Sequence, residues 1–247
     1  MGIAVLGTCA YLFQELLAPF LRPRFDYRVR AVNRLNPTTL EVVLAPVTQP
    51  LSFVAGQFVF VAFDGVASRE YHPFTISSTP QDRNLRLSIK MLGDYTQRLY
   101  ATLQPGEAVI VGRAFGMFDY RKGGCEQIWI AGGIGITPFL SWIRAFPETL
   151  PFDIDFYYTV RTPEDALFRD EIEAATRKHP GFRAHLEYSS SQGKLSVEST
   201  ARTCSGTIGE KDIYMCGPTA LMTSFQRALR KRGLSAHQIH FEDFNFR

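Results

Sequence analysis

The stretch Trp129-Ile-Ala-Gly-Gly-Ile-Gly-Ile-Thr-Pro138 joins a short apolar run to a glycine-rich turn that ends in proline. An apolar run of this length predicts a buried strand, and proline is well suited to the first turn of a helix. The glycines let the backbone approach a ligand, and free amide N–H groups at a helix start attract an anion. The stretch therefore predicts a strand, a turn and a helix that could hold a pyrophosphate, although a purely structural turn explains it equally well.

The chain around this stretch, from residue 122 to residue 247, alternates predicted strands with predicted helices. Lys122-Gly-Gly124 is a plausible linker in front of it. The expected strands are 128–131, 152–160, 183–188 and 213–216, and the expected helices are 138–146, 164–178 and 218–232. This alternation predicts a doubly wound parallel sheet, which binds ligands at the carboxyl ends of its strands.

Residues 23–121 show a different pattern, with short strands separated by turn residues. Phe25-Asp-Tyr-Arg-Val-Arg30 alternates with period two, and Asn36-Pro37 turns the chain into Thr39–Ala45. Several short strands at this spacing predict an antiparallel barrel, with one helix over residues 96–103. The expected fold class is therefore a β barrel over 23–121 followed by an α/β domain over 122–247.

Residues 1–22 are expected to form an apolar, membrane-associated helix, the remnant of a last spanning helix. Gly2–Leu21 is mostly apolar and close to the length that a spanning helix needs, about 20 residues. The arginines that follow would keep the rest of the chain on the cytoplasmic side. We therefore expect the chain at the cytoplasmic face of the bacterial cell membrane. The alternative is an amphipathic helix packed on the protein or lying on the membrane surface.

Composition argues against several classes of function. The net charge is +3 and no lysine-rich patch is interleaved with aromatics, so nucleic acid is not an expected partner. The cysteines Cys9, Cys125, Cys204 and Cys216 have neither zinc spacing nor an iron–sulfur pattern, so no metal site is predicted. Any redox cofactor should therefore be organic, or be held by another chain.

Three further motifs contain candidate site residues. His72-Pro-Phe-Thr75 places a ring donor, an aromatic face and a hydroxyl on one strand, and Gly93-Asp-Tyr-Thr96 offers N–H groups at a helix start. Tyr214-Met-Cys-Gly-Pro218 ends a strand at the same sheet edge as the glycine turn. Taken one at a time, a surface histidine, a barrel core phenylalanine and a buried core cysteine explain these residues at least as well. Arg161, at the end of the second strand, could meet a ribose phosphate or be a solvated strand end.

From about Arg24 to Arg247 the chain resembles the ferredoxin–NADP reductase superfamily, which joins a flavin-binding barrel to a nicotinamide-binding sheet domain. Within it, His72–Thr75 resembles the flavin motif of membrane-bound NADPH oxidases and bacterial ferric reductases. The resemblance implies that His72 lies near the flavin phosphates, Phe74 against the flavin ring and Thr75 near its reactive nitrogen. Gly93–Thr96 would hold the flavin pyrophosphate.

The resemblance also implies roles on the nicotinamide side. The family's pyrophosphate loop is matched by Gly132, Gly133, Gly135 and Thr137, and its nicotinamide-facing turn is matched by Cys216-Gly-Pro218. Glu242 and Phe244 match a carboxylate and a ring that lies against the flavin, although Phe246 could stack instead. Ser189–Ser191 stands where plant-type members carry serine and arginine, which leaves the choice between NADPH and NADH open.

The expected site residues form two sets. The predicted catalytic residues are Thr75, Cys216, Glu242 and Phe244. The predicted cofactor-binding residues are His72, Pro73, Phe74, Thr75, Ile89, Lys90, Gly93, Tyr95, Thr96, Gly132, Gly133, Gly135, Thr137, Pro138, Arg161, Cys216, Gly217, Pro218, Phe244 and Phe246. The expected cofactors are FAD and either NADPH or NADH.

The leading functional hypothesis is an FAD-dependent NAD(P)H oxidoreductase, the dehydrogenase part of a ferric-reductase or oxidase-like chain. The electron acceptor would be a ferric chelate, dioxygen, a haem or a redox protein. One alternative is a soluble flavin or ferredoxin-type reductase. Another is a regulatory module that kept the fold and lost catalysis.

Overall fold

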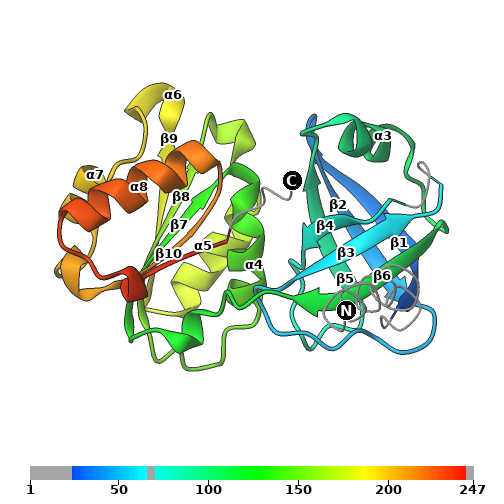
Figure 1. Cartoon of the computed structure of the whole chain (residues 1–247), viewed down its shortest axis with the longest axis horizontal. Helices are drawn as coiled ribbons and strands as arrows, with labels where there is room; N and C mark the ends of the chain where they lie inside the picture. Colours follow the sequence, from blue (N-terminus) through cyan, green and yellow to red (C-terminus); the bar gives the residue numbers. More distant parts are fainter. Residues whose placement is uncertain (1–23, 66–69, 243–247) are drawn as a thin grey trace, which may run out of the picture.

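The computed structural model describes residues 24–65 and 70–242, and these form an antiparallel barrel and a parallel sheet domain lying side by side (Figure 1). The barrel strands are β1 (Phe25–Asn36), β2 (Thr39–Pro46), β3 (Phe58–Phe63), β4 (His72–Thr75), β5 (Leu85–Lys90) and β6 (Ala108–Phe115). They pair in the order β4-β3-β6-β1-β2-β5. The edge strands approach each other through an antiparallel bridge between Ile76 and Leu87.

Alternating side chains fill the interior of the barrel. Tyr27 and Val29 on β1, which point inward, are 1% and 2% exposed, whereas Arg28 between them is exposed. The one barrel helix predicted is α3 (Asp94–Thr102), which covers one end of the barrel (Figure 1). It begins two residues earlier than predicted because Thr96 Oγ1 accepts hydrogen bonds from the amides of Leu92 and Gly93.

The second domain is a five-stranded parallel sheet in the order β11-β10-β7-β8-β9. Its strands are β7 (Glu126–Gly132), β8 (Asp153–Val160), β9 (Phe182–Tyr188), β10 (Asp212–Cys216) and β11 (Ile239–Glu242). Its helices are α4 (Thr137–Arg144), α5 (Arg169–Lys178), α6 (Ser189–Gln192), α7 (Val197–Thr203) and α8 (Thr219–Lys231). Short 3₁₀ turns are η2 (Tyr120–Lys122), η3 (Gly133–Ile136), η4 (Pro163–Asp165), η5 (Ile208–Glu210) and η6 (Ala236–Gln238).

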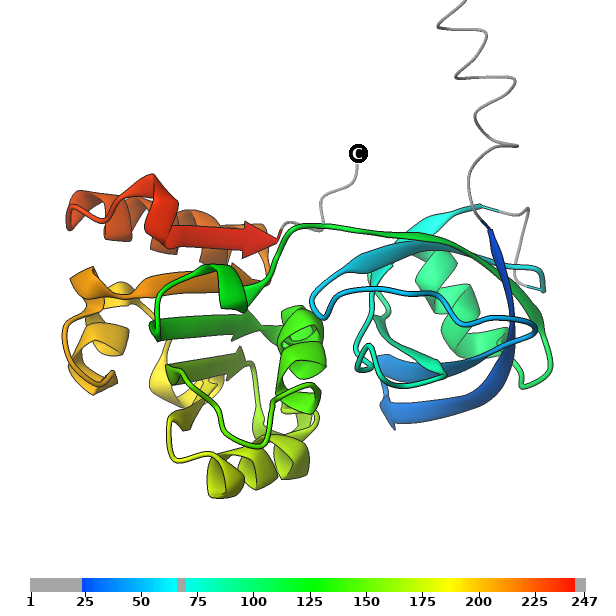
Figure 2. The same ribbon diagram turned by 90° about the horizontal axis from the view of Figure 1, so that it is seen from below.

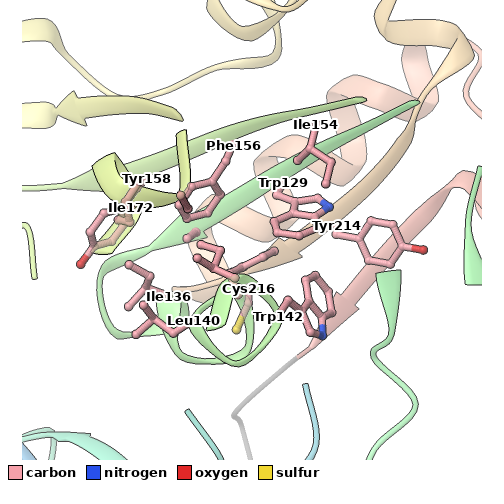
Figure 3. Packing of buried hydrophobic residues seen from close by; sticks show 14 of the residues in the cluster. Trp129, Ile136, Leu140, Trp142, Ile154, Phe156, Tyr158, Ile172, Tyr214 and Cys216 are labelled. Carbon is pink, nitrogen blue, oxygen red and sulfur yellow. The ribbon is translucent and has the colours of Figure 1, made fainter. Parts of the chain in front are cut away.

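Two hydrophobic clusters lie on opposite faces of this sheet, as a doubly wound fold requires. One packs α4 and α5 against the sheet and is rich in aromatic rings, among them Trp129, Trp142 and Phe156 (Figure 3). The other packs Phe225 and Leu229 of α8 against the opposite face. The predicted fold class, an antiparallel barrel followed by a doubly wound parallel sheet, is confirmed.

A charged cluster closes the amino end of the sheet, the edge opposite to the predicted ligand site. Lys211 is fully buried, and its Nζ donates to Glu126 Oε2 and to Ser205 Oγ, each at 3.2 Å. Arg183 Nε donates to the buried Asp155 at 2.8 Å. The Ser205 amide donates to the other oxygen of Asp155 at 2.9 Å. The cluster therefore ties the segment before β10 to the first residues of three other strands.

Replacing Lys211 with methionine should lower the free energy of unfolding by about 3 to 5 kcal/mol, because it removes a fully buried cation that pairs with the buried Asp155 carboxylate and leaves only Arg183 to offset that charge. Urea unfolding of the two proteins measures this. The control is Arg232→Met, which removes an arginine from a surface pair with Glu198 at 3.5 Å. An exposed pair of this kind contributes at most about 1 kcal/mol. Equal losses for the two variants would contradict a structural role for the buried cluster.

Acid should weaken the same cluster. Burial raises the pKa of Asp155, but hydrogen bonds from His185, Arg183 and the Ser205 amide outweigh it and hold the pKa well below 3.8. A carboxyl with a depressed pKa in the folded state contributes stability that is complete above its unfolded pKa and is lost as the pH falls below it. The free energy of unfolding should therefore fall as the pH drops below 3.8, more steeply in the unmodified protein than in Asp155→Asn. Parallel pH profiles would contradict this assignment.

Candidate functional site

A pocket of about 190 Å³ opens at the side of the barrel that faces the sheet domain. We call it the barrel pocket. It is lined by His72, Pro73, Phe74, Thr75, Ser88, Ile89, Lys90, Leu92, Thr96, Ile134 and Thr137. Ile134 lies in the turn after β7 and Thr137 begins α4, so both domains build the pocket. Eight of the predicted cofactor-binding residues therefore lie around one pocket, and Ser88, Leu92 and Ile134 were missed.

Thr75 is the most informative side chain in the barrel pocket. It ends β4, where it lies opposite Phe58, and it is 5% exposed. Among the described residues its Oγ1 has no hydrogen-bond partner. A buried hydroxyl without a partner costs free energy, so such a group in a pocket wall points to a polar ligand atom. The pocket thus fits a ligand that combines an apolar ring with a hydrogen-bonding edge.

His72, in the wall of the barrel pocket, stacks on Tyr95, which does not itself line the pocket. The His72 and Tyr95 rings lie 3.6 Å apart between centroids, at 24° to each other. His72 Nε2 also lies 3.3 Å from Glu70 Oε2. Burial raises the pKa of Tyr95 to about 12, so its hydroxyl stays protonated at neutral pH.

Phe74 has contacts on both sides of the barrel wall. It lines the pocket, yet it also packs against the barrel core, with its ring 6.4 Å from that of Phe63 in an edge-to-face arrangement. Phe74 therefore packs with the barrel core, and its side that lines the pocket is where the predicted contact with a ligand ring would be made.

A second pocket of about 440 Å³ lies at the carboxyl edge of the parallel sheet, and we call it the sheet-edge pocket. It is lined by Lys90, Gly132, Gly133, Thr159, Val160, Arg161, Ser189, Lys194, Leu195, Pro218, Ala220, Leu221 and Ser224. Lys90 lines both pockets, which places them next to each other across the domain boundary. Lys194 was missed from the sequence, although a cation directly after Gly193 and close to a strand end was a usable signal.

The glycine turns after β7 and β10 cross in close contact. A Cβ on Gly135 would lie 2.3 Å from the carbonyl oxygen of Cys216, and a Cβ on Gly217 would lie 2.9 Å from Gly132 N and Cα. Gly217 also has a φ of +159°, at the border of the left-handed region. The glycines therefore serve the close packing of two backbones as well as access for a ligand. Pro138 is buried in the first turn of α4.

Of the predicted catalytic residues that the structure describes, only Thr75 lines one of the two pockets. Cys216 is fully buried in the same cluster as Leu140 and Trp142, and it lines neither pocket (Figure 3). Glu242 approaches the barrel, with its Oε1 3.7 Å from where a Cβ on Gly116 would be. Phe244 and Phe246 lie outside the described residues.

Two families of domains match the chain in succession. Residues 24–126 match the FAD-binding domain family, and residues 129–227 match the oxidoreductase NAD-binding domain family. The chain belongs to the ferredoxin–NADP reductase superfamily. The predictions of FAD, of a nicotinamide dinucleotide and of an NAD(P)H-dependent flavoprotein oxidoreductase are confirmed at this level.

Curated members of the superfamily resemble the chain over most of its length. The glycine betaine monooxygenase reductase subunit of Chromohalobacter salexigens is 27% identical over 207 residues, which is 78% of this chain and 56% of that protein. The propane 2-monooxygenase reductase component of Rhodococcus jostii is 28% identical over 239 residues, 90% of this chain and 64% of that protein. The chain thus spans less than two thirds of the length of these relatives.

Solved structures show the same fold. A ferredoxin NADP⁺ reductase from Neisseria gonorrhoeae with bound FAD and NADP superposes with a TM-score of 0.77 at 21% identity, covering 89% of this chain and 98% of that one. Phthalate dioxygenase reductase superposes with a TM-score of 0.73 at 23% identity, covering 88% of this chain and 67% of that one.

The membrane predictions need correction. The predicted location at the cytoplasmic face of the bacterial cell membrane is contradicted, because the relatives are named as reductase subunits and components of monooxygenases. Within residues 24–65 and 70–242, no helix has the length and apolar character needed to cross a membrane. The membrane-associated helix was predicted for residues 1–22, which lie outside the described part of the chain. The closer link to ferric reductases and NADPH oxidases is not shown either.

Proposed function

We propose that the chain is the FAD- and nicotinamide-binding part of a reductase that takes a hydride from NAD(P)H and delivers electrons singly to a separate redox protein. The observation that carries the proposal is the position of Lys90, which lines the barrel pocket and the sheet-edge pocket together. Two pockets that share a wall allow two flat heterocycles to meet, and hydride transfer requires that contact.

The flavin ring of FAD would enter the barrel pocket, where the Thr75 hydroxyl would hydrogen-bond it and Phe74 would lie against it. The His72 ring, held by its stacking on Tyr95, would lie near the phosphate end, together with the Thr96 amide in the first turn of α3; the Gly93 amide already donates to Thr96 Oγ1. When bound, FAD supplies an acceptor for a hydride and a donor of single electrons. Ile134 and Thr137, from the sheet domain, would exclude water from the ring edge.

The nicotinamide dinucleotide fits the sheet-edge pocket. Gly132 and Gly133 would let the pyrophosphate approach the backbone before α4, and Lys90 would offset part of its charge. Arg161 and Lys194 would lie near the adenosine end. Because Cys216 is fully buried, we propose that it packs beneath the nicotinamide-facing turn.

For the acceptor, the relatives favour the flavin or ferredoxin-type reductase over the ferric-reductase or oxidase-like chain. The described residues hold a pocket with an unsatisfied hydroxyl, which also argues against a regulatory module without catalysis.

Anaerobic titration of the FAD-loaded protein tests the proposal. NADH or NADPH should bleach the flavin absorption, and an iron–sulfur ferredoxin added afterwards should restore it. Ferric chelate and dioxygen serve as competing acceptors in parallel samples. A protein that takes up no FAD, or that keeps oxidised FAD with either nucleotide in excess, would overturn the proposal.

A further inference from the structure

Helix α4 lies against the barrel and joins the two domains through direct hydrogen bonds (Figure 2). Ser141 Oγ donates to the Ser78 carbonyl at 2.7 Å. The Trp142 indole N–H donates to the Ala55 carbonyl at 3.0 Å. Both donors are fully buried and must keep their acceptors, so these bonds fix the position of α4 on the barrel.

Arg144, the last residue of α4, shares its guanidinium between the two domains. Nη1 donates to the Ser77 carbonyl of the barrel at 2.7 Å, and Nη2 lies 3.5 Å from Glu41 on β2. Nε and Nη2 also donate to the two carboxylate oxygens of Glu171 on α5, each at 2.7 Å. The side chains of Arg144 and Glu41 are only 10% and 8% exposed, so this link is largely withdrawn from water.

The other end of α4 carries the residues that meet the barrel pocket. Thr137 begins the helix and Ile134 lies in the turn before it, and both line that pocket. A helix of eight residues is about 12 Å long and rigid. A shift of Arg144 relative to the barrel therefore moves Thr137 relative to the flavin side of the pocket.

The part of the domain boundary around Arg144 is polar, whereas Ala55 and Trp142 beside it belong to the aromatic cluster. On the barrel side this polar part includes the buried Glu41, Ser77 and Ser78. Interfaces of this kind between domains usually permit relative motion unless specific contacts fix them. Arg144 supplies such contacts to both domains at once.

We propose that Arg144 is a positioning residue, which fixes the nucleotide-binding turn over the barrel pocket so that hydride donor and acceptor meet at a productive distance. The proposal rests on the proposed hydride transfer between the two pockets. A displacement of about 1 Å from a reactive alignment can slow a reaction by about 100-fold. Neither pocket is lined by Arg144, so its loss should leave the binding of each cofactor nearly intact.

The experiment compares Arg144→Gln and Arg144→Lys with the unmodified protein. We expect Arg144→Gln to slow anaerobic flavin reduction by about 10- to 100-fold, with the dissociation constants of FAD and nucleotide changed by less than about threefold. Arg144→Lys, which keeps the charge but not the planar fork, should fall between the two. Amide hydrogen exchange over residues 137–144 should become at least about tenfold faster in Arg144→Gln.

Arg169→Gln is the matched control, since it breaks an exposed pair with Glu173 on α5, 3.7 Å apart. Glu41→Gln is the second test variant, for use if Arg144→Gln does not fold. It removes only the barrel carboxylate that faces Arg144, and it should also slow flavin reduction. An unchanged reduction rate in folded Arg144→Gln, or in Glu41→Gln in its place, would overturn the proposal. If the unmodified protein itself shows no reduction, the proposed function fails instead.

Discussion

Replacing Gly135 with alanine should slow flavin reduction by nicotinamide by about 100-fold or more, because the added methyl group pushes two backbones apart. Its Cβ would lie 2.3 Å from the carbonyl oxygen of Cys216 and 2.7 Å from Gly217 Cα, distances that real Cβ atoms do not adopt. The neighbours are backbone atoms and cannot rotate away. The turns after β7 and β10, which form the sheet-edge pocket, must therefore separate.

Stability should fall as well, by about 1 to 3 kcal/mol, the usual cost of forcing an extra methyl into packed structure. Stopped-flow spectroscopy and urea unfolding measure the two effects on the same samples. Gly209→Ala is the control, because a Cβ there meets no atom within 4 Å and the φ is ordinary. Gly209→Ala should stay within about 0.5 kcal/mol of the unmodified protein. If Gly135→Ala matched Gly209→Ala in both reduction rate and stability, the close contact between the two turns would not be needed.

Replacing Thr75 with alanine should slow flavin reduction by about 100-fold, the loss seen when one aligned hydrogen-bond donor is removed from a reacting group. The expectation follows from the buried Oγ1, which lines the barrel pocket without a partner among the described residues. Nicotinamide affinity should change far less, since Thr75 does not line the sheet-edge pocket.

A second measurement separates this role from a general packing defect. Without FAD, Thr75→Ala should be about as stable as the unmodified protein, because losing a buried, unsatisfied hydroxyl offsets the loss of the buried methyl group. With FAD, the gain in melting temperature on binding should be smaller than for the unmodified protein. Thr75→Ser keeps the hydroxyl and should retain most of both effects. A normal reduction rate in Thr75→Ala would remove Thr75 from the mechanism.

The elements that the sequence predicts well are those with a strong local pattern. The alternation at Phe25–Arg30 became part of β1, and the apolar run before Gly132 became β7. Predictions were wrong where a hydrogen bond between a side chain and the backbone shifts the start of a helix. The helix expected from residue 164 begins at Arg169, because Pro163–Asp165 forms a 3₁₀ turn in which the Asp165 carboxylate accepts from the Thr162 amide. The strand β11 and the polar helix α7 carry too little apolar periodicity to be recognised.

The site follows the same division. Motifs such as His72–Thr75 and the glycine turns are contiguous, so local spacing alone is enough to pick out their residues. The link of Arg144 to Glu41 and Glu171 joins three elements that are distant along the chain, and no pattern of spacing pairs them. Periodicity also cannot show that the Thr75 hydroxyl lacks a partner, since that depends on every neighbour at once.

The charged cluster around Lys211 and Asp155 holds the parallel strands together at the edge far from both pockets. Because the strands are held together there, the turns at the carboxyl ends of the strands need to contribute little to the stability of the domain. Apart from the crossing glycines and the buried Ile136 and Cys216, those turns should accept substitutions, or exchange with the turns of related reductases, without loss of the domain. The preference of this chain for NADH or NADPH should therefore be open to redesign by grafting loops, as long as the charged side chains at the amino end of the sheet are kept.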